Sequence, residues 1–314
     1  MERSVVKIEN LVKRYKELLA LDHFNLDIQK GEIFGLLGPN GSGKTTTMNC
    51  MLALLSYDKG NIEIFGEKMT ADNYGIKKRI GVVPQEVAVF DELTVYENID
   101  YFCGLYIKNR VTRAQYVKEA IDFVELNDFV KFSPKKLSGG LKRRLNIACG
   151  IAHKPELILL DEPTVAVDPQ SRNRILEGIQ RLNKEGATIV YTSHYMEEVE
   201  QLCNRISIMD KGKNLAIGTK EELKSMVETG ETIVVEILDF DAEIMQGIRK
   251  MEHVFHANYE NSFLRVKYNG GNHNIISLLD FLRQKEISFG RVFSELPTLN
   301  DVFLEITGKE LRDA

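Results

Sequence analysis

The glycine-rich stretch that decides the fold of this chain is Gly38, Pro39, Asn40, Gly41, Ser42, Gly43, Lys44, Thr45 and Thr46. It follows an apolar segment, residues 33–37, and precedes a segment in which apolar residues have helical spacing. Its pattern is a glycine, four residues, then Gly, Lys and Ser or Thr, which is typical of a phosphate-binding loop. Because both neighbours also fit, the sequence predicts a loop that joins a buried strand to a helix and binds phosphate groups.

Each residue type in this loop has a physical role. Glycines allow left-handed backbone angles and bring N–H groups close to phosphate oxygens. A helix that begins near Lys44 directs its positive end at the same anion. Lys44 adds a mobile positive charge against the outer phosphates, and Thr45 offers a hydroxyl to Mg²⁺, an ion that keeps several waters and takes few protein ligands.

Two carboxylates follow a buried strand later in the chain. Residues 157–160 are a continuous apolar run, typical of a strand buried on both faces of a parallel sheet, and Asp161 and Glu162 come directly after it. In an α/β fold, the carboxyl ends of such strands share an edge with the phosphate loop. We therefore interpret one carboxylate as holding a metal ion through its waters, while the next orients and deprotonates an attacking water.

Two further strands end in polar residues. Residues 188–193 are predicted to form one more buried strand, which leads to His194, and the strand predicted before Pro84 leads to Gln85. Strands that alternate with helices predict a P-loop α/β core. Residues 4–31 alternate between apolar and polar in places, which indicates a small antiparallel sheet before the phosphate loop.

An inserted helical subdomain is predicted at about residues 87–147. Two candidate capping boxes lie in it, one from Thr94 to Glu97 and one from Thr112 to Gln115. The subdomain closes on a second candidate anion site at the start of a helix, formed by Ser138, Gly139 and Gly140. The basic residues 142–144 that follow are interpreted as a solvated face or as a bridge between subdomains.

The pattern changes after Thr219, so we predict two domains, residues 1–219 and residues 220–314. The second part has elements in the order β-α-β-β-α-β, which predicts a small ferredoxin-like α+β domain with one more helix after it. No catalytic constellation is evident there, because its histidines have no carboxylate at metal-site spacing.

Composition and charge disfavour several classes of protein. The net charge of −5 disfavours a dominant nucleic-acid surface, because neutralising phosphates needs a surplus of Lys and Arg. The four cysteines are scattered without a CxxC pair, as expected of buried thiols in a reducing compartment. No apolar run is long enough to predict a transmembrane helix.

Taken in order, these motifs resemble the nucleotide-binding subunit of an ATP-binding cassette (ABC) transporter over residues 4 to about 219. The phosphate loop, glutamine loop, signature, acidic strand and switch histidine of that family match, in this order, residues 38–46, Gln85, residues 137–141, residues 157–162 and His194. A signature at this short distance before the acidic strand is specific to the family among P-loop proteins. The implied fold is an ABC ATPase core with an antiparallel β subdomain and a helical subdomain, followed by the small α+β domain.

The resemblance implies that the chain binds and hydrolyses ATP with Mg²⁺. The implied catalytic residues are Lys44, Gln85, Glu162 and His194. The implied ligands of the metal are Thr45, Gln85 and Asp161. The implied nucleotide-binding residues are Tyr15 as the adenine-stacking aromatic, Gly38, Asn40, Gly41, Ser42, Gly43, Lys44, Thr45, Thr46, Ser138, Gly139 and Gly140.

The resemblance also implies partners. Two cassettes, expected to be a homodimer, would pair head to tail, so that residues 138–140 of one contact the γ-phosphate held by Lys44 of the other. A separately encoded polytopic permease would contact the cargo, and the chain would bind no nucleic acid directly. It is expected in the cytoplasm, on the inner face of the cell membrane through its permease.

Two departures from the family pattern and one narrower resemblance stand out. The signature ends in Leu141 where Gln is most frequent, and Ala166 stands where Gly is usual. Residues 141–150 and 297–305 resemble exporter ATPases of the daunorubicin-resistance type. The alternatives are a soluble ABC ATPase that acts on ribosomes or nucleic acid, which would carry two cassettes or long coiled coils, and an unrelated P-loop kinase or GTPase, which would have no use for residues 138–140.

Overall fold

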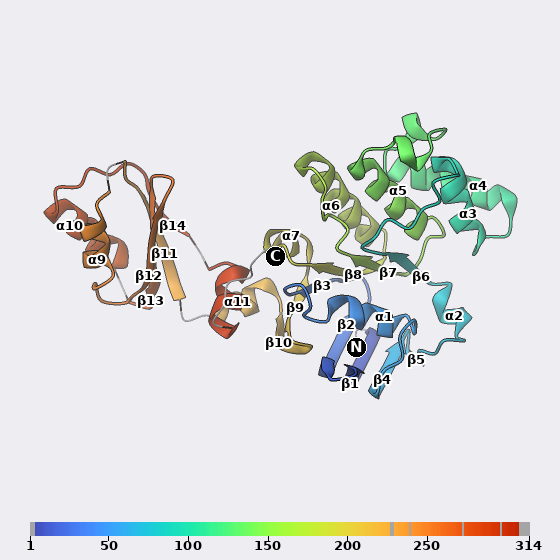
Figure 1. Ribbon diagram of the computed structural model, residues 1–314, viewed down its shortest axis with the longest axis horizontal. Coiled ribbons are helices and arrows are strands. Elements are labelled where there is room, and N and C mark those ends of the chain that lie inside the picture. Colours follow the sequence, from blue (N-terminus) through green and yellow to red (C-terminus); the bar gives the residue numbers. More distant parts are fainter. Residues whose placement is uncertain (1–3, 227–228, 239, 272, 296, 308–314) are drawn as a thin grey trace. The chain divides into compact units, whose positions relative to one another are not determined.

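The computed structural model describes every residue except 1–3, 227–228, 239, 272, 296 and 308–314. The described residues form two compact units (Figure 1), one that runs to Thr219 and one that begins at Lys220. The first unit contains two sheets and an inserted group of helices, and the second contains one sheet with its own helices. The described helices include none that is long and apolar enough to span a membrane.

The central sheet of the first unit has six strands in the order β10-β9-β3-β8-β7-β6. Its strands are β3 (Ile33–Leu37), β6 (Ile80–Val83), β7 (Leu157–Asp161), β8 (Thr188–Ser193), β9 (Arg205–Asp210) and β10 (Lys213–Gly218). All neighbours are parallel except β9 and β10, which form an antiparallel hairpin. Strands β3, β7 and β8 are buried at every position, as their apolar runs predict. Because β3, β6, β7 and β8 are parallel, the residues that follow them meet at one edge.

A second, antiparallel sheet of the first unit has the order β2-β1-β4-β5, which confirms the sheet predicted before the phosphate loop. It consists of β1 (Ser4–Tyr15), β2 (Leu18–Gln29), β4 (Lys59–Ile64) and β5 (Glu67–Lys68). Helix α1 (Lys44–Met51) begins in the phosphate loop, and α2 (Tyr74–Lys77) follows the sheet. One hydrophobic core joins both sheets and α1, because Leu11, Phe24, Met48 and Leu159 belong to the same buried cluster.

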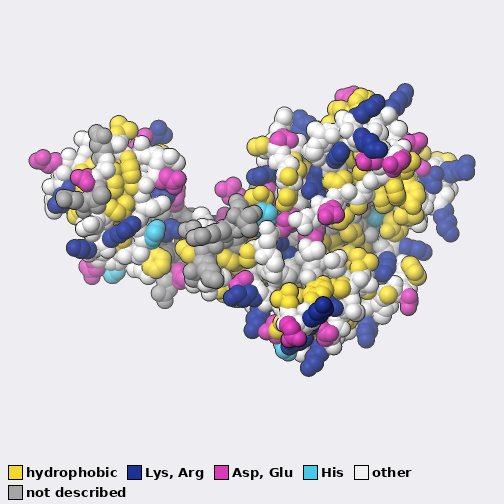
Figure 2. All heavy atoms as spheres, in the orientation of Figure 1, with side chains coloured by type: hydrophobic (Ala, Val, Ile, Leu, Met, Phe, Trp, Pro, Cys, Tyr) yellow, Lys and Arg dark blue, Asp and Glu magenta, His cyan; other side chains and the backbone are white. Residues whose placement is uncertain are grey.

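The inserted helices are α3 (Val95–Gly104), α4 (Arg110–Phe123), the short 3₁₀ turns η1 (Asn127–Phe129) and η2 (Pro134–Lys136), and α5 (Gly139–Ile151). The capping box from Thr94 to Glu97 is present at the start of α3. The predicted box at Thr112 is wrong, because α4 begins earlier, with the Asn109 side chain accepting the backbone N–H of Thr112. Figure 2 shows hydrophobic side chains at the surface over this part of the chain.

Two helices flank the strands that carry the candidate acids and histidine. Helix α6 (Pro169–Lys184) begins with proline at its first position, and the Asp168 carboxylate accepts the backbone N–H of Ser171 at 2.9 Å. Helix α7 (Met196–Leu202) follows β8 directly and buries Glu198, Val199 and Leu202.

The second unit has the predicted β-α-β-β-α-β order. After α8 (Lys220–Ser225) come β11 (Thr229–Glu236), α9 (Ala242–Ile248), β12 (Val254–Glu260), β13 (Phe263–Asn269), α10 (Asn274–Gln284), β14 (Val292–Glu295) and α11 (Leu299–Thr307). The sheet order is β12-β13-β11-β14, and all neighbours are antiparallel. Between α10 and the last strand, Ile287 donates its backbone N–H to the Leu282 carbonyl at 3.0 Å.

Candidate functional site

The phosphate loop connects β3 to α1 and needs its glycines for two separate reasons. Gly41 and Gly43 have φ angles of 81° and 108°, which L side chains rarely adopt. At Gly38 a Cβ would lie 2.3 Å from the carbonyl oxygen of Met209, so no side chain fits there. The loop is therefore a backbone-lined cradle at the edge where the parallel strands end.

Lys44 occupies this cradle. Its side chain is 5% exposed, and its Nζ donates to the carbonyl oxygens of Gly38 at 2.8 Å and Pro39 at 3.2 Å. Ser42 is buried beside it, and its hydroxyl has no hydrogen-bond partner among the described residues. A buried hydroxyl and a buried ammonium group that face a backbone cradle form a site for an anion. Thr45 is exposed and Thr46 is partly exposed at the start of α1.

The carboxylate of Glu162 is the centre of the site. One oxygen lies 3.2 Å from Lys44 Nζ, and the other lies 3.3 Å from both Gln85 Nε2 and His194 Nδ1. The Glu162 side chain is only 5% exposed. Four sequence-predicted site residues from four separate segments therefore meet at one buried carboxylate.

Thr192, which sequence reasoning missed, joins the two acids. It pairs with Asp161 across β7 and β8, and its hydroxyl donates to Asp161 Oδ1 at 2.6 Å. The same hydroxyl accepts the backbone N–H of Glu162 at 3.0 Å. The only sequence signal for this role is position, since Thr192 lies near the carboxyl end of a strand next to the acidic strand.

Glu162 also has an unusual backbone. Its φ angle is 45°, in the left-handed region that non-glycine residues seldom occupy. Such a conformation persists only where surrounding contacts hold it, and it occurs preferentially at functional sites.

Arg143 is a second residue that sequence analysis did not assign to the site. Its guanidinium donates to the backbone oxygens of Gln85 and Val165, and the side chain is buried. Burial lowers the pKa of Arg143, whereas the nearby Glu162 carboxylate acts in the opposite direction. Arg143 thus links α5 to the loops on both sides of Glu162, which agrees with the bridging interpretation of the basic residues 142–144.

The second candidate anion site lies at the start of α5. Ser138 caps this helix, and its hydroxyl accepts the backbone N–H of Leu141 at 3.3 Å. Ser138 and Gly139 are exposed, whereas at Gly140 a Cβ would lie 2.7 Å from Ser171 Oγ. Within the part of the chain that the structure describes, no hydrogen bond or ion pair joins these residues to the Lys44 cluster.

Tyr15 is the last residue of β1, and its side chain is 44% exposed. The Lys13 ammonium group lies 5.1 Å from the centre of its ring. The ring thus lies at the end of β1, with nearly half of the side chain exposed.

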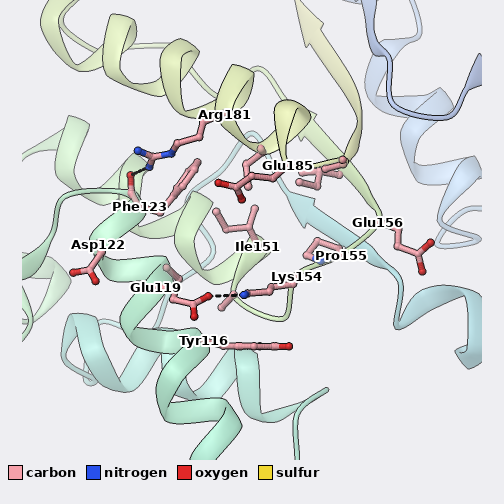
Figure 3. A pocket seen from close by; sticks show the side chains of 16 residues that line it. Tyr116, Glu119, Asp122, Phe123, Ile151, Lys154, Pro155, Glu156, Arg181 and Glu185 are labelled. Carbon is pink, nitrogen blue, oxygen red and sulfur yellow. Dashed lines mark hydrogen bonds and ion pairs between the residues drawn. The ribbon is translucent and has the colours of Figure 1, made fainter.

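A cavity of about 720 Å³ lies elsewhere, between α4, the end of α5 and α6 (Figure 3). Lys154, one of its two cations, pairs with Glu119 at 2.5 Å, and Arg181 donates to the Phe123 carbonyl at 2.8 Å. Both cations already have partners within the protein, and carboxylates such as that of Glu185 also line the cavity. The cavity therefore does not suit a phosphate group.

Comparisons with known proteins identify the family of the chain. The sequence pattern of the ABC transporter family matches residues 21–165. The linearmycin resistance ATP-binding protein LnrL of Bacillus subtilis (strain 168) is 38% identical over 311 residues, which cover 98% of this chain and 100% of that protein. The chain belongs to the family of ABC transporter ATP-binding proteins. The daunorubicin resistance ATP-binding protein DrrA3 of Streptomyces coeruleorubidus is 31% identical, with 99% of this chain and 98% of that protein covered.

Solved structures of ABC ATPases have the same fold. The cassette MJ0796, in a dimeric post-hydrolysis state bound to ADP and Pi, has a TM-score of 0.63 and 29% identity over 68% of this chain and 98% of its own. The family resemblance and the ABC ATPase fold predicted from the sequence are therefore confirmed. This ABC protein binds ATP and is an ATPase.

One departure from the family pattern has a structural consequence. Ala166 has a φ angle of 57°, in the left-handed region that glycine adopts without strain. A left-handed backbone at this position accounts for the glycine that is usual in ABC proteins. This chain keeps the same backbone conformation with an alanine. The other departure, Leu141, lies in the first turn of α5 with its backbone N–H bonded to Ser138.

Proposed function

We propose that this chain is the ATP-hydrolysing subunit of an exporter, in which pairing of two cassettes drives a separately encoded membrane permease. The observation that carries the proposal is the shared carboxylate of Glu162, which lies within 3.3 Å of Lys44, Gln85 and His194. Relatives named for linearmycin resistance, daunorubicin resistance and Nod factor export support the direction of transport.

In the proposed reaction, Glu162 acts as general base toward the attacking water. A carboxylate that accepts a hydrogen bond from the Gln85 amide and lies 3.3 Å from the His194 imidazole is held in place, so little reorganisation is needed when the water loses its proton. His194 then orients this base, and Lys44 leaves the Glu162 carboxylate to bind the outer phosphates of ATP. The orphan hydroxyl of Ser42 and the cradle N–H groups of residues 40–46 bind the same phosphates.

Residues with the oxygen donors that Mg²⁺ prefers lie at the edge of the central sheet that carries the phosphate loop. Thr45 supplies an exposed hydroxyl, Gln85 an amide oxygen and Asp161 a buried carboxylate, and hard oxygen donors with few protein ligands suit this ion. The donor set therefore fits Mg²⁺, and we assign these three residues to it. When bound, the ion neutralises charge on the β- and γ-phosphate oxygens.

Tyr15 is assigned to the adenine ring. Its half-exposed aromatic face and the neighbouring Lys13 ammonium group suit stacking of a flat, electron-rich base. It closes the nucleotide site on the side of the antiparallel sheet.

We assign residues 138–140 to the nucleotide of a second cassette. They are at the N-terminus of a 13-residue helix, where backbone N–H groups and the helix dipole favour an anion. Among the described residues of one chain, no hydrogen bond or ion pair joins these residues to the Lys44 cluster. In a two-fold pair of identical chains, residues 138–140 of each chain would face the nucleotide held by Lys44 of the other, which makes two equivalent sites at one interface.

The permease is proposed to dock beside Gln85. Phe90 and Tyr101 are exposed at 43% and 47%, and their rings pack edge to face at 5.1 Å. Exposed aromatic side chains are typical of interaction surfaces, and hydrophobic side chains gather over these helices (Figure 2). Through such a permease the chain would lie on the cytoplasmic face of the membrane, and only the permease would contact the cargo.

The test replaces Glu162 with glutamine in the full-length protein. Glu162→Gln should lose nearly all ATP turnover, retain ATP binding and form an ATP-dependent dimer on size-exclusion chromatography. The exposed residue Glu185, changed to glutamine, is the matched control for loss of one charge. Near-normal turnover by Glu162→Gln would overturn the assignment of the base.

A further inference from the structure

Glu198 carries a buried carboxylate that the proposed reaction does not use. Its side chain is 3% exposed and belongs to α7, the helix that follows β8 and His194. Its Oε2 accepts hydrogen bonds from Tyr191 OH at 2.7 Å, Thr164 Oγ1 at 2.8 Å and Ser193 Oγ at 3.2 Å. Its Oε1 lies 3.3 Å from Arg172 Nε. Four partners on one carboxylate offset the large desolvation cost of burying its charge.

The partners of Glu198 come from the turn after Glu162, from the end of β8 before His194, and from α6. Thr164 is two residues after Glu162, Ser193 is one residue before His194, and Arg172 lies in the first turns of α6. The Ser193 hydroxyl also accepts the backbone N–H of Tyr195 at 2.9 Å, which fixes the turn at His194. One carboxylate thus ties together the two loops whose side chains meet at Glu162.

The turn after Glu162 needs such support. Glu162 and Ala166 both have positive φ angles, 45° and 57°, and Thr164 lies midway between them. Strained backbone of this kind persists where neighbouring contacts hold it. The Thr164 hydroxyl donates to Glu198, and its oxygen also lies 3.2 Å from Tyr191 OH, which donates to the same carboxylate.

Tyr191 shows how enclosed this network is. The side chain is fully buried, and burial, followed by the neighbouring Glu198 carboxylate, raises the pKa of Tyr191 well above its ordinary value of 10.0. The phenol therefore stays protonated and donates to Glu198 throughout the physiological pH range.

We infer that Glu198 is a positioning residue for ATP hydrolysis, which holds the Glu162 turn and the His194 turn at a fixed separation. The inference rests on the proposed function, since it acts through the general base and its histidine. Glu198 does not contact the phosphate loop in the described structure, so it should govern the rate of the chemical step and leave nucleotide binding unchanged.

The test compares steady-state ATPase kinetics of the purified full-length protein and four variants. Glu198→Gln keeps the shape and one acceptor oxygen but removes the charge. Thr164→Val removes one donor with an isosteric side chain. The double variant combines them, and Glu197→Gln, an exposed neighbour on α7, is the matched control.

For Glu198→Gln we expect kcat to fall about tenfold, because small displacements of positioned groups are costly in rate. The KM for ATP should stay within about twofold of the control, and the double variant should be no slower than Glu198→Gln by more than about twofold, since both changes break the same contact. A purely structural role would instead lower thermal stability and leave kcat per folded molecule intact.

The inference is overturned if Glu198→Gln has the kcat of Glu197→Gln, or if its loss is entirely in KM. Should Glu198→Gln fail to fold, Thr164→Val decides, and an unchanged kcat in that variant rejects the inference. Failure of the proposed function is distinct, because then the unmodified protein would not hydrolyse ATP or Glu162→Gln would remain active.

Discussion

The hydroxyl of Thr192 offers a sharp test of how the acidic edge is built, through the isosteric change Thr192→Val. Thr192 is fully buried, and its hydroxyl makes two hydrogen bonds, one to Asp161 Oδ1 at 2.6 Å and one from the backbone N–H of Glu162 at 3.0 Å. The valine removes both bonds without leaving a cavity. Loss of the bond to Asp161 and loss of the bond from Glu162 have different effects on stability, and this difference sets the expected change in the free energy of unfolding.

The Glu162 N–H also donates to the Thr192 carbonyl oxygen at 3.2 Å, so it keeps a partner in the variant. Asp161 is 5% exposed, and one of its carboxylate oxygens loses a short, charge-assisted bond. Removing the partner of a buried charged group costs about 1.5–3 kcal/mol. We expect Thr192→Val to lower the free energy of unfolding of the first unit by about this amount.

The assay is urea-induced unfolding followed by circular dichroism, with Thr192→Ser as the matched control. Serine keeps the hydroxyl and loses one methyl group, which should cost about 0.8 kcal/mol. Because Asp161 is the proposed Mg²⁺ residue, the Mg²⁺ concentration for half-maximal ATPase activity should also rise in Thr192→Val and stay near normal in Thr192→Ser. Equal stability of the two variants would refute the reasoning.

Two further changes test strain and protonation. Ala166→Gly should relieve the left-handed backbone strain and raise the free energy of unfolding by about 1 kcal/mol, measured as a shift in urea midpoint, and an unchanged or lower midpoint would contradict this. Burial lowers the pKa of the His153 imidazole from its ordinary value of 6.5, although the hydrogen bond with the Ile80 carbonyl opposes this shift. The unfolded chain therefore binds the imidazole proton more tightly than the folded protein does. Stability should therefore fall as the pH drops from 6.5, by at most about 1.4 kcal/mol per unit, and His153→Gln should remove this part of the slope; identical slopes would reject it.

The chemistry of the phosphate loop could be predicted because it is local. Glycine spacing, Lys44 and the start of α1 are determined within a few residues, and so are the buried strands that end at Asp161 and His194. The meeting of these segments at Glu162 follows from parallel strand order, which the alternation of strands and helices indicates.

The contacts that depend on register could not be predicted. Thr192, Arg143 and Glu198 are ordinary residue types in ordinary segments, and their partners are distant in sequence, so only the pairing of β7 with β8 and the packing of α5 and α7 reveal them. The predicted cap of α4 was wrong for a different reason. Asn109 and Thr112 are both acceptable caps, and the local rule cannot choose between them.

The central claim is that one site is built from two chains, and mixing two inactive variants tests it most directly. Lys44→Ala removes the phosphate-binding ammonium, and Ser138→Arg blocks the exposed start of α5. Each variant alone should be inactive. In an equal mixture, half of the dimers contain both variants, and each of these has one complete site of two, so about a quarter of the unmodified activity should return. A mixture that stays inactive, although both variants fold and form mixed dimers, would contradict the account.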